Sequence, residues 1–367
     1  MTQERRAAIA LSYLTGVGPI RAKRLLAKAG SFAGVFELPD DTLQDIGVPE
    51  AARRQLGDGS ALVAADRELE SIERYGVEVI DCLSERYPKR LSDASDGPVV
   101  LYYRGTAPLD APRTVGVVGT RKPTPHGRDA CERLVEELRD YNVTTISGLA
   151  YGVDIAAHEA SLRQGVPTIA VLAHGLAEIY PTAHRATAQR MVEEGGGLLT
   201  EYPCGVRSRK TFFPQRNRII SALSDALVVV ESAQRGGSMI TANLATGYHT
   251  PVFAFPGRNR DPMSAGTNEL IKSHKAHLLQ SAKDIGYILG WSAHDAGEAT
   301  GRANLLFQTF APAEQQIIDT LQGCDDLDLD NIALKTGLLN GELAAHLLEL
   351  EFKGAIKNLP GKRYTLA

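Results

Sequence analysis

The central part of the chain alternates short apolar runs with segments of helical periodicity. Six runs of β-branched and aliphatic residues predict strands at Thr114–Val118, Val143–Ser147, Thr168–Leu172, Leu198–Thr200, Ala226–Glu231 and Val252–Phe255. Helical spacing predicts helices between them at Gly127–Tyr141, Asp154–Gln164, Ala183–Glu194 and Ser238–Thr246. Apolar strands separated by helices are typical of a mainly parallel sheet that is covered on both faces. Residues 80–289 are therefore predicted to form a doubly wound α/β domain.

Residues 1–75 are predicted to form a small all-α domain. Apolar residues at helical spacing flank Gly16-Val17-Gly18, and Pro19 suits the first turn of the helix that follows. The arrangement resembles a helix-hairpin-helix or SAM-like domain, in which N–H groups of the glycine turn face a DNA phosphate. A weaker copy lies at Leu43–Leu56. Ordinary helical turns in a small packing domain explain the same pattern, so both interpretations stay open.

The C-terminal region follows the element order of a winged helix. Ser292–Asn304 is rich in small and polar residues without periodicity, which predicts a linker. Three helical segments and two short strand-like pieces about a Pro360-Gly361 turn follow it. Residues 305–367 are therefore predicted to form a winged-helix-like domain.

Composition adds limits on the class of protein. The 367 residues are 43% hydrophobic and 23% charged, which excludes wholesale disorder and fibrous architectures. The four cysteines form no CxxC pair, so the sequence predicts neither a zinc site nor a redox dithiol. Apolar stretches long enough for a signal peptide or a membrane span are absent from the sequence. We expect a cytoplasmic protein without membrane insertion.

The formal net charge of −4 argues at first against a nucleic-acid partner. The charge is unevenly distributed, however. Residues 1–30 carry +5, residues 31–80 carry −7, and residues 290–367 carry −5. A net charge of −4 is therefore compatible with local basic segments that could bind an anion.

Glycines and hydroxyl residues follow the predicted strands at their carboxyl ends. Examples are Gly119-Thr120, Ser147-Gly148, Gly237-Ser238 and Gly266-Thr267. In an open parallel sheet these loops meet at one edge, where ligands bind. Neither a GxGxxG fingerprint nor a P-loop is present, so the loops indicate an anion site, most simply for phosphate, rather than a named nucleotide fold.

The segment Gly205–Ser221 contains five cations and no acid, with Phe212 and Phe213 among them. Cations that pair with phosphates, next to rings that stack on bases, favour single-stranded nucleic acid. The alternative is a solvated basic helix start in which one phenylalanine belongs to the core, and we expect one of the two rings to be core. Glu201 and Asp225 are predicted to hold loop backbone or to pair with nearby arginines.

Five segments in this order and spacing resemble the DNA-processing protein A family, also called DprA or Smf: GTRKPTPHG, SGLAYGVDIAAHEASL, FFPQRNRIISALSDALVVVES, GGSMITANLA and FAFPGRNRDPMSAGTNELI. The resemblance implies an extended Rossmann-like domain that binds and protects incoming single-stranded DNA. It also implies a homodimer that loads the RecA recombinase in natural transformation and homologous recombination, without a cofactor. The two terminal domains are candidates for contacts with duplex DNA or with another competence protein.

Carried over residue by residue, the resemblance implies a DNA pocket. The pocket residues would be Gly119, Thr120, Arg121, Gly148, Lys210, Phe213, Gln215, Arg216, Asn217, Arg218, Gly237 and Ser238. Arg121, Lys210 and Arg216 would hold phosphates. Phe213 would stack on a base, and Asn217 would hydrogen-bond the strand.

The alternative function is a nucleotide-processing enzyme that resembles the phosphoribohydrolases of the same superfamily. Their PGGxGTxxE motif supplies a glutamate for acid–base work, whereas no carboxylate occurs between Ser238 and Tyr248 here. Asp154 and His158 lie four residues apart on one helix, a spacing more typical of an N-cap and a packing contact than of catalysis. We therefore predict no catalytic residue and no metal site.

Overall fold

A computed structural model describes residues 3–293, 310–322, 327–352, 355–359 and 363–366. The chain divides into two compact units, Met1–Ser292 and Ala293–Ala367, and each is described by itself. The predicted linker Ser292–Asn304 falls almost entirely outside the described residues. Within the described part of the chain, every helix is too short or too polar to cross a membrane.

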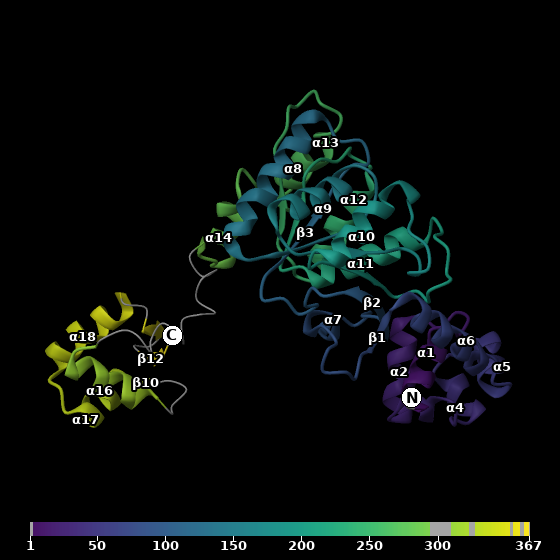
Figure 1. The fold of residues 1–367 in the computed structure, drawn as a ribbon, viewed down its shortest axis with the longest axis horizontal. Coiled ribbons are helices and arrows are strands. Elements are labelled where there is room, and N and C mark those ends of the chain that lie inside the picture. Colours follow the sequence, from purple (N-terminus) through teal and green to yellow (C-terminus); the bar gives the residue numbers. More distant parts are fainter. Residues whose placement is uncertain (1–2, 294–309, 323–326, 353–354, 360–362, 367) are drawn as a thin grey trace. The chain divides into compact units, whose positions relative to one another are not determined.

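The chain begins with short helices, as predicted (Figure 1): α1 (Gln3–Leu11), α2 (Pro19–Ala29), α3 (Phe32–Val35), α4 (Asp40–Asp45), α5 (Glu50–Gly57) and α6 (Ser60–Tyr75). Gly18 is the extended N-cap of α2, and Pro19 occupies its first turn. The apolar faces of these helices share one core with Val100 and Tyr102 of the sheet. The N-terminal helices are therefore packed onto the α/β part.

A nine-stranded sheet forms the centre of this unit, in the order β1-β2-β6-β5-β4-β3-β7-β8-β9. Its strands are β1 (Glu78–Asp81), β2 (Val100–Gly105), β3 (Thr114–Val118), β4 (Thr144–Ser147), β5 (Thr168–Val171), β6 (Gly197–Thr200), β7 (Ala226–Val229), β8 (Val252–Ala254) and β9 (His277–Leu278). The six predicted strands are confirmed and pair in parallel. The unpredicted strands β1 and β2 join the edge beside β6 with antiparallel pairing.

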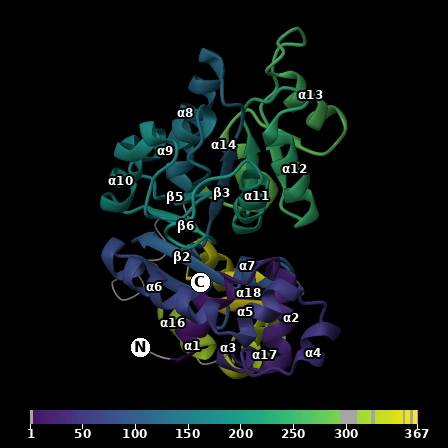
Figure 2. The same cartoon turned by 90° about the vertical axis from the view of Figure 1, so that its right-hand side faces the viewer.

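Two helical layers cover the sheet (Figure 2). One contains α8 (Pro125–Leu138), α9 (Val153–Gln164), α10 (Arg185–Glu193) and α14 (Ala282–Leu289), with short 3-10 turns η1 (Arg139–Tyr141) and η2 (Thr182–His184). The other contains α7 (Lys89–Asp93), α11 (Phe212–Leu223), α12 (Gly237–Gly247) and α13 (Ala265–Lys272). Alternate residues of each strand enter different cores: Val115 and Val117 pack with α8 and α9, whereas Val118 packs with α11 and α12. This two-sided burial explains the continuous apolar runs.

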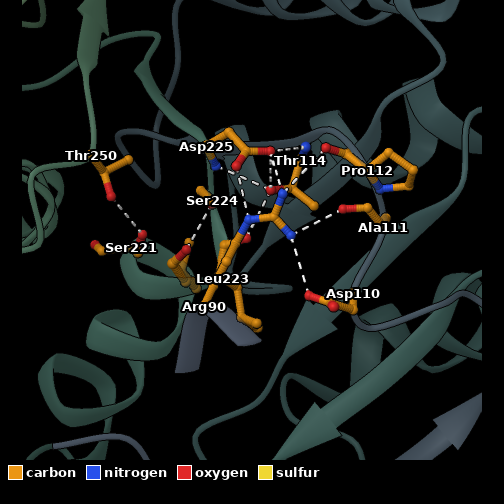
Figure 3. A network of polar contacts seen from close by, with 11 residues as sticks. Arg90, Asp110, Ala111, Pro112, Thr114, Ser221, Leu223, Ser224, Asp225 and Thr250 are labelled. Carbon is orange, nitrogen blue, oxygen red and sulfur yellow. Dashed lines mark hydrogen bonds and ion pairs between the residues drawn. The ribbon is translucent and has the colours of Figure 1, made fainter. Parts of the chain in front are cut away.

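A polar network closes the amino ends of β3 and β7 (Figure 3). The Arg90 guanidinium of α7 donates to both carboxylate oxygens of Asp225, at 2.8 and 2.7 Å, and to the Ala111 carbonyl at 3.0 Å. Asp225 also accepts the Thr114 N–H at 2.8 Å. The prediction that Asp225 holds loop backbone and pairs with an arginine is confirmed.

The second unit is a winged helix, as predicted. Its described residues form the helices α16 (Pro312–Leu321), α17 (Leu329–Thr336) and α18 (Asn340–Phe352) and a small antiparallel sheet of β10 (Leu327–Asp328), β12 (Arg363–Leu366) and β11 (Ile356–Leu359). Ile317, Leu343 and Leu347 are almost completely buried in its core.

Candidate functional site

The strand order places a topological switch point between β3 and β7. After β3 the chain builds β4, β5 and β6 on one side, and then returns to place β7 and β8 on the other side. The loops that leave the carboxyl ends of β3 and β7 therefore diverge and open a crevice. A cleft of about 550 Å³ lies there, lined by these two loops and by the start of α11. We call it the main cleft.

Glu231, which follows β7, fixes the loop after β3 through hydrogen bonds. The Glu231 side chain is buried, and its carboxylate accepts the Thr124 N–H at 2.8 Å and the Thr124 hydroxyl at 2.5 Å. The backbone carbonyl of Glu231 accepts the Thr120 N–H at 2.7 Å. Gly119 and Thr120 consequently line the main cleft on a firmly held loop, and Arg121 stands exposed at its rim.

Cationic and aromatic side chains meet at the mouth of the main cleft. The Arg121 guanidinium carbon lies 5.3 Å from the centre of the Phe213 ring, a cation–π distance. Lys210 also lines the cleft and is exposed. Tyr180 approaches Phe213 edge-on with ring centres 6.2 Å apart. Phe212 instead stacks on Tyr202, with ring centres 4.4 Å apart. Both phenylalanines are half-buried, so the prediction that one of the two rings belongs to the core is wrong.

Arg216 lies beneath the main cleft rather than at its rim. Its side chain is 3% exposed, and its Nη1 donates to the carbonyl oxygens of Gly148, at 2.6 Å, and of Val171. Burial lowers the pKa of Arg216 to about 10, so the guanidinium stays charged at neutral pH. Burial also raises the pKa of Asp154, against the opposing effect of the nearby Arg216 charge.

Gly148 has a steric reason to be glycine. A Cβ at this position would come within 2.5 Å of the Arg216 guanidinium and 2.6 Å of an Asp154 carboxylate oxygen. The residue therefore makes room for the buried arginine under the cleft, and it is not among the residues that line the cleft.

The other face of the cleft is the start of α12. Gly237 begins this helix and lines the cleft, with open space where a side chain would be. The Ser238 hydroxyl donates to the Ser232 hydroxyl at 2.8 Å, and the Asn217 amide donates to Thr241 Oγ1 at 2.9 Å. The amino end of a helix favours an anion, so this face complements Arg121 and Lys210.

Two predicted site residues point away from the main cleft. Arg218 forms an ion pair with Glu201, which confirms the predicted pairing of that acid, and donates to the Asp96 carbonyl. Gln215 accepts the Tyr202 hydroxyl at 3.1 Å. Both residues line a separate cleft of about 600 Å³ beside the first turn of α2. Residues three or four apart share a face of a helix, so Gln215 and Arg218 lie on one face of α11, whereas Phe213 and Asn217 lie on another.

His158 is a packing residue, as predicted, whereas Asp154 is not the N-cap of α9: Gly152 holds that position, and Asp154 lies in the first turn of the helix. His158 Nδ1 lies 2.7 Å from the Thr168 hydroxyl inside the core, and burial lowers the histidine pKa to about 3. The imidazole is therefore neutral and cannot exchange protons with a ligand near pH 7.

Among the described residues, the side chains that could together reach one cation lie in the winged helix and not in the cleft. They are Glu314, His346 and Glu349.

Sequence analysis missed Glu231, Tyr180 and Thr241 as parts of the site. Glu231 lies two residues after β7 and closes an apolar run, and a single acid at the end of such a run is the one local signal that could have marked it. Tyr180 belongs to a loop that follows a predicted strand, but nothing in its immediate sequence indicates that it meets Phe213. That proximity depends on the strand order.

The fold and the cleft together define a Rossmann-like protein whose switch-point cleft has a helix amino end, a basic rim and aromatic rings. A family model for DNA recombination-mediator protein A matches residues 78–289, and one for the DprA winged helix domain matches residues 307–362. The chain belongs to this family. Its six predicted strands and the motif that begins at Gly119 lie inside the matched range.

Named relatives agree with this assignment. DNA processing protein DprA of Bacillus subtilis is 36% identical over 242 residues, which is 66% of this chain and 77% of the relative. A structure of DprA from Streptococcus pneumoniae superposes with a TM-score of 0.67 at 29% identity, covering 78% of this chain and 98% of that one. A structure described for the single-stranded DNA binding mode of DprA from Helicobacter pylori has a TM-score of 0.53 at 32% identity, covering 59% and 97%.

Proposed function

We propose that this protein binds single-stranded DNA along the carboxyl edge of its sheet, without a catalytic step. The observation that carries the proposal is the main cleft, where exposed Arg121 lies against the Phe213 ring and exposed Lys210 lines the same cleft. Cations in one cleft with a stacking ring are the combination that binds single strands without sequence preference. The single-stranded DNA binding described for the Helicobacter pylori relative supports the same conclusion.

Each part of the cleft has a distinct role in this proposal. Arg121 and Lys210 pair with phosphates, and Phe213 stacks on a base. Backbone N–H groups of the two glycine loops face a phosphate, at Gly119 on one side and at Gly237 and Ser238 on the other. The Thr120 N–H is donated to the Glu231 carbonyl, so Thr120 shapes the loop instead. The Asn217 amide hydrogen-bonds the strand.

Arg216 and Gly148 act from below the cleft. The buried Arg216 charge raises the positive potential of the cleft, and its bonds to main-chain carbonyls hold the floor in shape. Arg218 and Gln215 stay outside the proposed strand contacts because their side chains are engaged with Glu201 and Tyr202.

Family membership extends the proposal to the cellular process. We propose that the protein forms a homodimer in the cytoplasm, protects incoming single-stranded DNA and delivers it to the RecA recombinase in natural transformation and homologous recombination. Two clefts in a dimer would engage one strand together, which raises the effective concentration of the second contact.

The proposal is tested by DNA-binding measurements over a salt series. Arg121→Ala and Lys210→Ala each remove one phosphate contact, so each is expected to weaken oligothymidylate binding by about 1 to 3 kcal/mol and to reduce the salt slope by about 1. Arg133→Ala, an exposed α8 arginine outside the main cleft, is the matched control. Unchanged affinity and slope in both cleft variants would sink the proposal.

The enzyme alternative has its own assay. Asp154 is the one carboxylate among the described residues that line the main cleft. It is 8% exposed and lies near the charged Arg216 guanidinium. We expect incubation with nucleoside monophosphates to release no free base, as followed by chromatography. Turnover that disappears in Asp154→Asn would instead establish hydrolysis.

A further inference from the structure

A second pocket adjoins the main cleft on the side of β5 and β6. It has a volume of about 390 Å³ and is formed by the loops that follow these two strands. Tyr180 lines both the main cleft and this pocket, and its side chain is 51% exposed. We call the second cavity the Tyr180 pocket.

The walls of the Tyr180 pocket are joined by backbone hydrogen bonds. The Gly175 N–H donates to the Val206 carbonyl at 2.8 Å, and the Ala177 N–H donates to the Cys204 carbonyl at 3.0 Å. A Cβ at Gly175 would come within 1.9 Å of the Pro203 carbonyl oxygen, so only glycine allows the two loops to approach this closely. The pocket is therefore a preformed feature of the sheet edge.

A buried carboxylate from the N-terminal helices holds one of these loops. Glu68 of α6 is 3% exposed, and it accepts the Cys204 N–H at 2.6 Å and the Tyr13 hydroxyl at 2.8 Å. The basic segment starts immediately after this anchor. Arg207 consequently projects from a loop whose base is held by the N-terminal helices.

Tyr180 is positioned by a buried histidine. The Tyr180 N–H donates to His174 Nε2 at 3.2 Å, while His174 Nδ1 lies 2.8 Å from the Gly175 carbonyl. Burial lowers the pKa of His174, which keeps the ring neutral, so Nδ1–H donates and Nε2 accepts. The contact ties the backbone of Tyr180 to the wall of the pocket and leaves its ring exposed.

The chemistry of the pocket suits a nucleotide better than a purely apolar ligand. Arg207 is exposed and lines the pocket together with the half-buried Ser208. Glu178 is the one carboxylate among the described lining residues, and a carboxylate can accept hydrogen bonds from exocyclic base amines. The pocket volume falls within the range of about 300–1,000 Å³ that holds small organic ligands.

We propose that the Tyr180 pocket receives a neighbouring nucleobase of the same single DNA strand that occupies the main cleft. The strand crosses Tyr180, which stacks on a base at the boundary, and Arg207 pairs with the phosphate beyond it. The inference rests on the proposed function and extends it, because it gives the strand a direction along the sheet edge, from β3 and β7 toward β6.

Arg207→Ala tests the path with strands of two lengths. We expect it to weaken binding of an oligothymidylate of about 16 nucleotides several-fold and to lower its salt slope by about 1. An oligothymidylate of about 4 nucleotides should keep its wild-type affinity, since it fills the main cleft alone. Arg133→Ala is again the control for loss of one exposed charge, and thermal unfolding verifies that each variant is folded.

Tyr180→Ala tests the stacking at the boundary. Loss of the ring should weaken binding of the longer strand about 5- to 100-fold, whereas Tyr180→Phe, which keeps the ring, should bind like the wild type. Photocrosslinking of a 5-iodouracil-substituted longer strand should label Tyr180, identified by mass spectrometry.

The outcomes separate the two proposals. If Lys210→Ala weakens the longer strand while Arg207→Ala and Tyr180→Ala do not, the Tyr180 pocket is excluded and the main cleft stands. If the wild-type protein binds neither strand, the proposed function fails, and the second pocket fails with it.

Discussion

At the scale of single residues, burial divides the basic segment into two groups. Arg207, Arg209 and Lys210 precede α11 and are exposed, whereas Arg216 is buried and Arg218 is paired with Glu201. All five carry the same charge in the sequence. Only the exposed group is available to phosphates, because taking a paired cation away from its partner leaves a buried charge unsatisfied.

His158 is expected to make folding sensitive to acid. Its pKa of about 3 lies below the ordinary value of about 6.5, so the unfolded state binds its proton more readily. This histidine's contribution to stability is therefore lost progressively as the pH falls from about 6.5 toward 3. Burial raises the pKa values of Asp154 and Glu201, so these two acids change the stability with pH in the opposite direction. Both acids are present in the wild type and in the His158→Gln variant, so they do not cause a difference between the two.

His158→Gln removes the titrating ring. Compared with wild type, the variant should show a flatter fall in the free energy of unfolding as the pH is lowered, with a difference in slope of up to about 1.4 kcal/mol per pH unit. Urea unfolding at a series of pH values measures it. His126→Gln, at an exposed position of α8, should follow the wild-type curve. Parallel curves for His158→Gln and wild type would contradict the prediction.

At the scale of elements, the carboxyl and amino ends of the parallel strands have different roles. The carboxyl ends of β3 and β7 diverge around the main cleft, while their amino ends are tied together by Arg90 and Asp225. Function and stability are thus separated along the same strands. This separation lets a variant at one end report on folding without touching the cleft.

Asp225→Asn should destabilise the fold but spare DNA binding. The substitution weakens the paired hydrogen bonds between Arg90 and Asp225, whose side chains are 23% and 27% exposed. The free energy of unfolding should therefore fall by about 2 to 4 kcal/mol. Asp110→Asn is the matched control, because Asp110 is 40% exposed and lies 3.7 Å from the same arginine; a loss below about 1 kcal/mol is expected. Equal losses in the two variants, measured by urea unfolding, would refute this account.

At the scale of the whole molecule, the site belongs to one compact unit. The residues that line the main cleft and the Tyr180 pocket all lie within Met1–Ser292. The winged helix has its own core, and residues 290–367 contribute a net charge of −5. An acidic segment does not favour phosphate binding, so it is not needed for the contacts proposed above.

A chain that ends at Ser292 should therefore fold and bind single strands with the affinity of the full chain, within about 3-fold. Circular dichroism and fluorescence anisotropy with the same oligothymidylate test this expectation. The full chain carrying Lys210→Ala provides the reference for a damaged cleft. An affinity as low as that reference would show that the C-terminal unit takes part in binding.

Periodicity was enough to predict the parallel strands, the doubly wound class and the winged helix, because burial on both faces of a sheet imposes continuous apolar runs. It did not reveal β1, β2 or β9. β1 and β9 are short and form the two edges of the sheet, which leaves little local signal. β2 is the longest strand, but it pairs antiparallel with β1 and β6 and so lies outside the alternation of strands and helices on which the prediction rested.

The candidate site was likewise predictable from the sequence only in part. Glycine loops, the basic segment and Phe213 are visible in the residues themselves, since phosphate and base contacts demand those residue types. The places of Arg216, Arg218, Glu231 and Tyr180 depend on strand order and on which face of α11 is turned inward. Chemical type is a property of the residue, but exposure and proximity arise from contacts between segments far apart in the chain, and these exist only after folding.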